Sequence, residues 1–184
     1  RFKTLSDGRR QILNFLLPGD FIGVQQRMSD GAVHGVQALT DVALCAFRRD
    51  ALWELHRNAP TLGFGVTWLT AHEESIVDDA LLSVGRRSAL ERVATLLVLL
   101  YKRAAAIGGD GDVAVDGVTF PLTQLHIADA LGLSLVHTNK TLRKLERMGL
   151  HRIADGRLQL LDLKALSRLA DLYGDGRPSP RPLI

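Results

Sequence analysis

The stretch "LTQLHIADALGLSLVHTNKTLRKLERMGL" (residues 122–150) places one glycine between two segments whose apolar residues recur at helical spacing. Thr123 precedes the first segment as a favoured N-cap. Gly132 permits the left-handed backbone of a tight turn, which a Cβ would oppose. Ser134 is a suitable cap for the second segment. The stretch therefore predicts a helix-turn-helix that bends at Gly132.

The second predicted helix has two different faces. Thr138, Leu142 and Leu145 recur at the spacing of a buried stripe, whereas the opposite face is polar and basic. An ordinary helical hairpin with a solvated basic face would show the same charges. The helix-turn-helix is favoured because Ala128 is small where the two helices cross and lies four residues before the glycine. In such a motif the second helix is shaped for the major groove of DNA.

The segment "GLHRIADGRLQLLDL" (residues 149–163) follows the basic helix directly. It predicts two short strands, about residues 150–154 and 158–161, around Asp155-Gly156, a favoured two-residue hairpin turn. A hairpin in this place is the wing of a winged helix-turn-helix. Residues 119–157 also hold more cations than anions, which supports contact with phosphates. The cations are Lys140, Arg143, Lys144, Arg147, Arg152 and Arg157, against Asp129, Glu146 and Asp155.

Composition limits the possible classes of protein. Of the 184 residues, 46% are hydrophobic and 23% charged, which suits one or two packed domains. The net charge is only +3, so any nucleic-acid site must be local. Cys45 is the single cysteine, so a reducing, cytoplasmic compartment is the expectation. No apolar run is long enough for a membrane span, and no signal peptide is visible. Because Arg1 opens the chain inside an expected strand, we expect a fragment that lacks its beginning.

The first fifty residues read as short strands. "RFKTL" and "QILNFLL" flank Asp7-Gly8 and predict a hairpin, which ends at "PGD" (residues 18–20). "FIGV" (residues 21–24) and "HGVQALTDVALCAFRR" (residues 34–49) continue the alternation and predict further strands. This half is expected to be a β structure of short hairpins.

From residue 50 the pattern becomes helical. "RDALWELHRNAP" (residues 49–60) predicts a short amphipathic helix that ends before Pro60. A long helix follows over residues 61–83, with a mainly apolar stripe at alternating steps of four and three. Part of the stripe is expected to pack on the β half of the same chain, and the length of the helix favours a homodimer through it. The predicted seam consists of Leu62, Val66, Leu69, Glu73, Ile76 and Ala80.

The remaining segments complete the order of elements. Val84-Gly85 predicts a hinge after the long helix, and Ser88 with Glu91 predicts a capping box that opens another helix. "VAVDGVTF" (residues 113–120) predicts a small hairpin before the helix-turn-helix. "DLKALSRLADL" (residues 162–172) predicts a last helix capped by Asp162, and the end of the chain is expected to be disordered.

In this order the parts resemble the Crp/Fnr family of bacterial transcription regulators. The resemblance rests on "SDGRRQILNFLLPGDFIG", "ALTDVALCAF", "VGRRSALERVATLL" and the helix-turn-helix stretch, and it covers nearly all of the chain. It implies an α+β fold: a partial, cyclic-nucleotide-binding-like β-roll sensor domain (1–60), a dimerisation helix (61–84), a winged helix-turn-helix domain (85–174) and a disordered tail (175–184). It further implies a cytoplasmic homodimer that binds a two-fold symmetric operator in double-stranded DNA; an activator would also contact RNA polymerase.

The effector pocket that the resemblance implies is degenerate in this chain. Members that bind cyclic nucleotides place a Glu directly after the glycine matching Gly23, and an Arg-Ser pair later. Here Val24 and His34-Gly35 stand in those places, so a cyclic phosphate lacks its arginine partner. We predict that cyclic AMP is not the effector, whose identity stays open. The iron–sulfur sensors of the family need three cysteines besides the one matching Cys45, so no cluster is expected.

Position in the family's motif assigns the expected DNA contacts. Val136 can pack on a thymine methyl, Asn139 can pair with adenine through both amide atoms, and Lys140 can donate to guanine. Relatives carry Glu and Arg where Val136 and Lys140 stand, so the familiar half-sites of the family are not expected. The residues expected at base edges are Leu135, Val136, Asn139, Lys140 and Arg143, and those expected at phosphates are Thr123, Gln124, Ser134 and His137.

Two other classes of protein compete with this interpretation. An enzyme on the β-roll would need clustered His and carboxylate ligands, and only His34 lies on a candidate strand. There is no Ser-His-Asp order, phosphate loop or zinc spacing, so we predict no catalytic residue and no metal site. The second rival is a ligand-sensing or protein-binding β-roll dimer without sequence-specific DNA binding.

Overall fold

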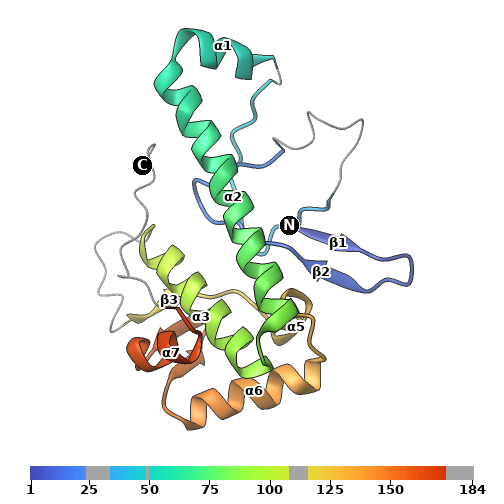
Figure 1. Cartoon of the computed structure of the whole chain (residues 1–184), viewed down its shortest axis with the longest axis vertical. Helices are drawn as coiled ribbons and strands as arrows, with labels where there is room; N and C mark the ends of the chain where they lie inside the picture. Colours follow the sequence, from blue (N-terminus) through green and yellow to red (C-terminus); the bar gives the residue numbers. More distant parts are fainter. Residues whose placement is uncertain (24–33, 49, 108–115, 173–184) are drawn as a thin grey trace.

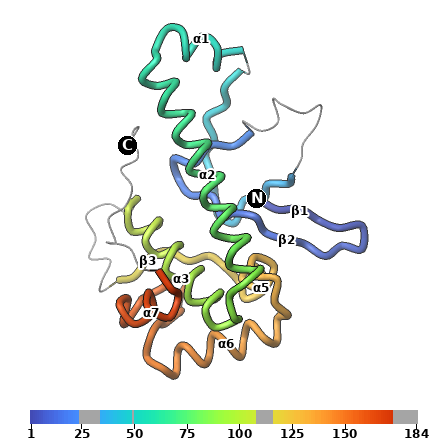
Figure 2. The backbone as a smooth tube through the Cα atoms, in the orientation of Figure 1, coloured from blue at the N-terminus to red at the C-terminus, as the bar shows by residue number. Residues whose placement is uncertain are grey.

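Helix α2 (Pro60–Arg86) runs through most of the length of the molecule and connects its two halves (Figure 1). The computed structural model describes residues 1–23, 34–48, 50–107 and 116–172. The N-terminal strands lie beside the middle of α2, and the C-terminal helices gather at its lower end, as the backbone trace also shows (Figure 2). Helix α1 (Ala51–Asn58) lies at the upper end. The predicted short and long helices are confirmed, with Pro60 at the first position of α2, where proline is well tolerated.

The N-terminal hairpin is confirmed, although its strands are short. Strand β1 (Phe2–Thr4) pairs antiparallel with β2 (Arg10–Ile12) across the turn that contains Asp7-Gly8. Strand β2 ends at Ile12, so most of "QILNFLL" is irregular. Ile12 is buried in the core shared with the C-terminal helices, which docks the hairpin on that part of the molecule.

The predicted strand over "ALTDVALCAF" is wrong. Residues 36–48 form no strand, and Gly35 makes only an isolated bridge to Phe2. Alternating apolar residues become a strand only when a neighbouring strand satisfies their backbone groups, and no described strand lies beside this segment. Leu44 and Phe47 are therefore largely exposed, at 72% and 69%. Of the predicted strand over "FIGV", residues 21–23 are also irregular, and residue 24 lies outside the described residues.

The break between the long helix and the next one lies later than predicted. Helix α2 continues through Val84-Gly85 to Arg86, and α3 (Ala89–Ala105) begins after Ser88. A single glycine costs a helix only about 1 kcal/mol, so it does not end one by itself. The capping box at Ser88 is confirmed: Ser88 N–H donates to Glu91 Oε2 at 2.6 Å, and Glu91 N–H donates to Ser88 Oγ at 3.5 Å.

The C-terminal part packs a small sheet and further helices around α3. Helices α5 (Gln124–Leu131) and α6 (Leu135–Arg147) form the helix-turn-helix, and α7 (Leu163–Leu169) follows the wing. The largest fully buried apolar side chains all lie here: Val93, Leu97 and Val98 of α3 with Ile127, Leu145, Leu158 and Leu166. The core of the described residues is therefore mainly that of the winged helix-turn-helix.

The sheet of this part has the order β3-β5-β4, with β3 (Val118–Thr119), β4 (His151–Ala154) and β5 (Arg157–Leu160). The predicted wing hairpin is confirmed. The hairpin predicted over "VAVDGVTF" is wrong in its described part, because β3 pairs with β5 of the wing instead of a strand of its own. Residues 113–115 lie outside the described residues, and so does the predicted tail.

The last described helix begins as predicted: Asp162 Oδ1 accepts a hydrogen bond from Ala165 N–H at 2.8 Å. Among the described residues, no helix is long and apolar enough to span a bilayer.

Candidate nucleic-acid interface

Local chemistry fixes the shape of the helix-turn-helix. Thr123 Oγ1 accepts from His126 N–H at 3.3 Å, and His126 Nδ1 accepts from Thr123 N–H at 3.2 Å, so a histidine completes the capping box. Gly132 ends α5 at φ 62° and ψ 36°, the left-handed conformation that favours glycine. Ser134 Oγ then accepts from His137 N–H at 3.2 Å and starts α6. The predicted caps and turn are confirmed.

Burial of one face of α6 fixes its rotation about its own axis. Thr138 and Leu145 are fully buried, and Leu142 is 7% exposed. The hydroxyl of Thr141 donates to the His137 carbonyl at 2.8 Å, which satisfies it within the helix. The opposite face of α6 is thereby turned to solvent. The helix itself lies along the lower edge of the molecule (Figure 2).

The residues predicted at base edges lie on or next to this solvent-facing side. Leu135 and Val136 at the start of α6 are 47% and 65% exposed, and Lys140 and Arg143 are exposed further along. Asn139 differs, because it is half-buried and its Oδ1 is buried without a hydrogen-bond partner. The predicted two-atom pairing with adenine is therefore not available to Asn139 in this rotamer.

A basic surface depression continues from these residues toward the end of α6. It is lined by Lys140, Arg143, Lys144, Glu146 and Arg147. All five side chains are exposed, so their charges meet solvent or an anionic partner and not a neighbouring helix. We refer to these five residues as the basic face of α6. One sign of charge dominates it, as contact with phosphates requires.

The residues predicted at phosphates are all exposed and lie at the two helix starts: Thr123, Gln124, Ser134 and His137. The oxygens of Thr123 and Ser134 accept capping hydrogen bonds, but each hydroxyl keeps its own hydrogen to donate. Donors at the start of a helix also benefit from the positive end of the helix dipole.

The wing carries two arginines: Arg152 is exposed to solvent, and Arg157 is held by hydrogen bonds. Asp155 and Gly156 both have positive φ, 53° and 69°, as a two-residue turn of this type requires. Arg152 on β4 is exposed. The guanidinium of Arg157 donates to the carbonyls of Asp116 and Gly117, which fastens β5 to the segment before β3. Arg157 therefore has a structural role, although its positive charge had placed it among the cations predicted to contact phosphates.

The pocket predicted for an effector is small in the described part of the chain. Gly23 and His34 line a cavity of about 30 Å³ together with Leu69 and Glu73 of α2. Small-molecule sites measure several hundred Å³. Gly35 is not among the residues that line this cavity. It forms a β-bridge with Phe2, and a Cβ at Gly35 would stand only 2.6 Å from the Phe2 ring, so a side chain there would clash. Val24 lies outside the described residues.

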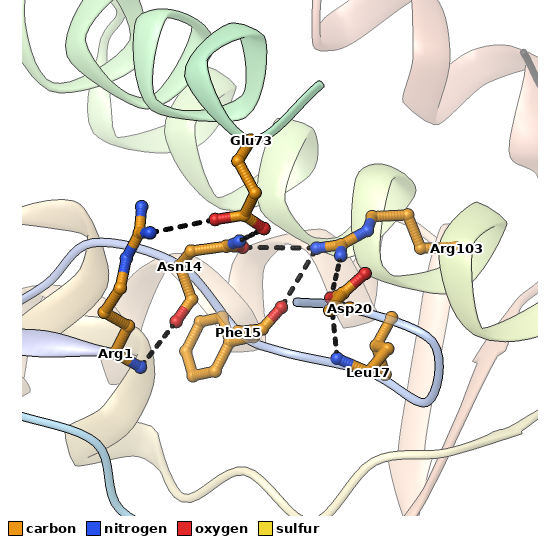
Figure 3. A network of polar contacts seen from close by, with 7 residues as sticks. All are labelled: Arg1, Asn14, Phe15, Leu17, Asp20, Glu73 and Arg103. Atoms are coloured by element: carbon orange, nitrogen blue, oxygen red, sulfur yellow. Dashed lines mark hydrogen bonds and ion pairs between the residues drawn. The ribbon is translucent and has the colours of Figure 1, made fainter. Parts of the chain in front are cut away.

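Figure 3 shows a buried network of polar contacts, in which Arg1 and Glu73 also line this cavity. Glu73 pairs with the Arg1 guanidinium at 3.0 Å and accepts from Asn14 Nδ2 at 2.8 Å. Burial raises the pKa of the Glu73 carboxyl, and the Arg1 cation opposes that shift. Partial burial and the same cation lower the pKa of His34, which therefore does not supply a positive charge near neutral pH. Sequence patterns gave no signal for these pairs, because the partners are far apart along the chain.

Arg103 of α3 forms the second half of the network. It donates to Asn14 Oδ1 at 3.2 Å, to the Phe15 carbonyl at 3.0 Å and to Asp20 Oδ2 at 2.6 Å. Asp20 in turn accepts from Leu17 N–H at 2.8 Å. The side chains of Arg103 and Asp20 are only 15% and 4% exposed. One arginine of the C-terminal part thus holds the loop that follows β2.

The predicted dimer seam turns mostly toward its own chain. Leu69 and Glu73 line the cavity described above, and Glu73 belongs to the buried network. Val66, Ile76 and Ala80 are half-buried, and only Leu62 is exposed, at 46%. Arg1 and Asn14 of the same chain supply the partners of Glu73.

The described residues contain no cluster of three or more His, Cys, Asp or Glu that could hold a metal ion. Cys45 is exposed on the irregular segment and is not in a strand.

Two family profiles match the chain. A profile described as the Crp-like helix-turn-helix domain matches residues 91–169, which include the helix-turn-helix and the wing. A profile described as the cyclic nucleotide-binding domain matches residues 1–59.

Several characterised proteins and solved structures are similar to this chain. The nitrogen fixation regulation protein FixK of Bradyrhizobium diazoefficiens is 36% identical over 92% of this chain and 69% of its own length. The transcriptional activator protein FnrL of Cereibacter sphaeroides is 31% identical over 98% of this chain and 71% of its own length. The structure of FixK2 from Bradyrhizobium japonicum superposes with a TM-score of 0.69 at 26% identity, over 91% of this chain and 80% of that one. A CRP-family transcriptional regulator from Thermus thermophilus gives a TM-score of 0.66 at 26% identity, over 92% of this chain and 82% of that one.

Proposed function

Because the chain belongs to the Crp/Fnr family of transcriptional regulators, we propose that it binds double-stranded DNA as a homodimer, with α6 of each subunit in the major groove. It acts as a regulator and not as an enzyme, in the cytoplasm where the DNA lies. The observation that carries the proposal is that the basic face of α6 is exposed, whereas the opposite face is buried in the core. An activator of this kind also contacts RNA polymerase.

The side chains of α6 suggest how bases are read. Leu135 and Val136 present exposed apolar groups that suit thymine methyls, and Lys140 presents a donor that suits guanine. Asn139 contributes one amide atom at most unless its rotamer changes. Arg143 lies one turn beyond Asn139 and reaches either a base or the adjacent phosphate. We therefore propose half-sites that differ from those of relatives carrying Glu and Arg in the places of Val136 and Lys140.

Replacing Lys140 with alanine is expected to weaken binding to a specific duplex by about 10- to 100-fold and binding to random duplex by much less. The reason is that a base contact distinguishes sequences, whereas a phosphate contact does not. The measurement is an electrophoretic shift with genomic fragments, titrated against salt and competitor DNA. Equal losses on both duplexes would show that Lys140 touches only phosphate. If the native chain shows no site that survives competitor DNA, the alternative of a ligand-sensing or protein-binding dimer stands.

We propose that the second copy packs on a face of α2 next to the predicted seam. Positions 67, 70, 74, 77 and 81 recur at steps of three and four, and four of them are exposed while Val77 is half-buried. The hydroxyls of Thr67 and Thr70 donate to carbonyls four residues earlier, at 3.1 and 2.9 Å, so their methyls are left to pack. In a parallel pair of α2 helices, Glu74 would face Glu74 of the second subunit. This contact lowers the stability of the dimer but favours one register of the two helices.

This face can be tested against the predicted seam with two matched substitutions. Leu81→Asp is expected to convert the dimer to a monomer, because it replaces an exposed leucine of the proposed contact face with a charge. Leu62→Asp changes an exposed leucine of the other stripe and is expected to leave the dimer intact. Light scattering after size-exclusion chromatography gives the mass of each variant. The reverse pattern would return the interface to the stripe that contains Leu62.

We propose that cyclic AMP is not the effector. In the described residues the cavity measures only about 30 Å³, and His34-Gly35 stand where members that bind cyclic nucleotides carry the Arg-Ser pair that holds the phosphate. Titration of the full chain with cyclic AMP in a calorimeter should give no heat of binding, and the nucleotide should leave the affinity for DNA unchanged. Tight binding would refute the prediction.

A further inference from the structure

The last turn of α5 is held by side chains of the N-terminal hairpin. Arg10 Nε of β2 donates to the Asp129 carboxylate at 2.9 Å, and Gln11 Nε2 donates to the Ala130 carbonyl at 2.9 Å. The carbonyls of a helix's last turn have no partner within their own helix, so an outside donor stabilises them. Gln11 of β2 thus caps the C-terminal turn of the first helix of the helix-turn-helix, directly before Gly132, and Arg10 holds the same turn through the Asp129 side chain.

Helix α3 completes this cap from the other side. Arg92 Nη1 donates to the Leu131 carbonyl at 3.1 Å, and its Nε donates to the Arg87 carbonyl at the break between α2 and α3. A cation at the end of a helix also interacts favourably with the helix dipole. Three successive residues of α5 are therefore held by donors from two other elements.

The Arg10–Asp129 pair is itself well held in place. The Arg10 guanidinium lies 5.4 Å from the centre of the Phe2 ring and donates to Gln37 Oε1 at 3.0 Å. The side chains of Arg10 and Asp129 are 23% and 19% exposed, far less than those of the Arg9–Asp7 pair in the same hairpin, at 77% and 50%. An arginine with three partners and little exposure has a defined orientation, unlike a solvated surface pair.

We propose that Arg10 and Gln11 are positioning residues for DNA recognition, an inference that rests on the proposed function. Helix α6 begins at Leu135, directly after the turn that β2 holds. A shift of that turn therefore moves the start of α6. A dimer places two such helices in successive major grooves, about 34 Å apart, so the orientation of each sets the half-site spacing that fits. The contacts leave the basic face of α6 exposed, so they are compatible with DNA binding by α6.

The test uses the full chain and the duplex that it selects from random DNA, with versions of that duplex carrying one or two base pairs more between the half-sites. Arg10→Gln is expected to weaken binding at the selected spacing about tenfold and to reduce the discrimination between spacings. The charge-reversed pair, Arg10→Asp with Asp129→Arg, should recover much of both. Arg9→Gln is the matched control and should change neither. A loss of stability alone would lower the active fraction but leave the spacing preference as it was.

Other results would overturn the inference. Native affinity and spacing preference in Arg10→Gln would show that the contact does not position α6, and tighter binding would show that it holds α6 away from DNA. If circular dichroism shows that Arg10→Gln is unfolded, Asp129→Asn and Gln11→Ala provide the same comparison with smaller changes. If the native chain selects no symmetric duplex, the proposed function is refuted. If the native chain selects one and Arg10→Gln binds it with the same affinity and spacing preference, only this inference is refuted.

Discussion

Replacing Arg103 with alanine is expected to lower the free energy of unfolding by about 3–5 kcal/mol, because the buried Asp20 carboxylate would lose its ion pair with Arg103. Asp20 is 4% exposed, so water cannot replace the lost partner. The Phe15 carbonyl and the Asn14 amide oxygen would lose donors at the same time. Urea unfolding followed by circular dichroism measures the change.

The control for this prediction is another arginine–aspartate pair of the same N-terminal segment. Arg9 and Asp7 are largely exposed, so Arg9→Ala should leave the urea midpoint unchanged. Replacing both buried partners, Arg103→Met with Asp20→Leu, should recover much of the stability, since an apolar pair leaves no charge unpaired. An effect of Arg103→Ala as small as that of Arg9→Ala would show that water reaches Asp20 and that the network does not hold the two halves together.

The second large effect is expected from the core of the winged domain. Leu145→Ala should cost about 3–5 kcal/mol, because Leu145 is fully buried and its loss leaves a cavity among packed neighbours. The rotation of α6 about its axis depends on this side chain. The variant should therefore unfold at lower urea concentration and bind specific DNA more weakly in proportion to its loss of folded protein.

Lys144 is the adjacent residue on α6 and gives the matched control. It is exposed on the basic face, so Lys144→Ala should leave the urea midpoint unchanged. It should weaken DNA binding to all sequences alike and reduce the slope of log affinity against log salt by about one. If Lys144→Ala destabilised the fold while Leu145→Ala did not, the two faces of α6 would be assigned the wrong way round.

The helix-turn-helix was predictable because short-range chemistry determines it. Thr123, Gly132 and Ser134 each act on backbone groups within four residues, so their roles can be read from neighbouring letters. The same holds for the capping box at Ser88 and for the turn at Asp155-Gly156. Burial of one face of α6 followed from the spacing of its apolar residues.

The predictions failed where a long-range partner decides the outcome. Residues 36–48 have the alternation of a strand, but no described strand lies beside them. Glu73 fits an interhelical seam by spacing, whereas Arg1 and Asn14 determine where it points. Arg10 and Asp129 are 119 positions apart, so no local sequence pattern predicts their contact. The break after α2 was misplaced because a glycine weakens a helix without ending it.

We expect α6 to enter the major groove of a two-fold symmetric operator. Selection of duplexes from a random library, with the native chain and Lys140→Ala in parallel, tests it most directly. The native chain should enrich an inverted repeat whose half-sites lie about one helical turn apart, roughly 10 base pairs centre to centre, and Lys140→Ala should lose preference at one position in each half. Enrichment of sequences without symmetry, or the same motif from both proteins, would contradict the claim.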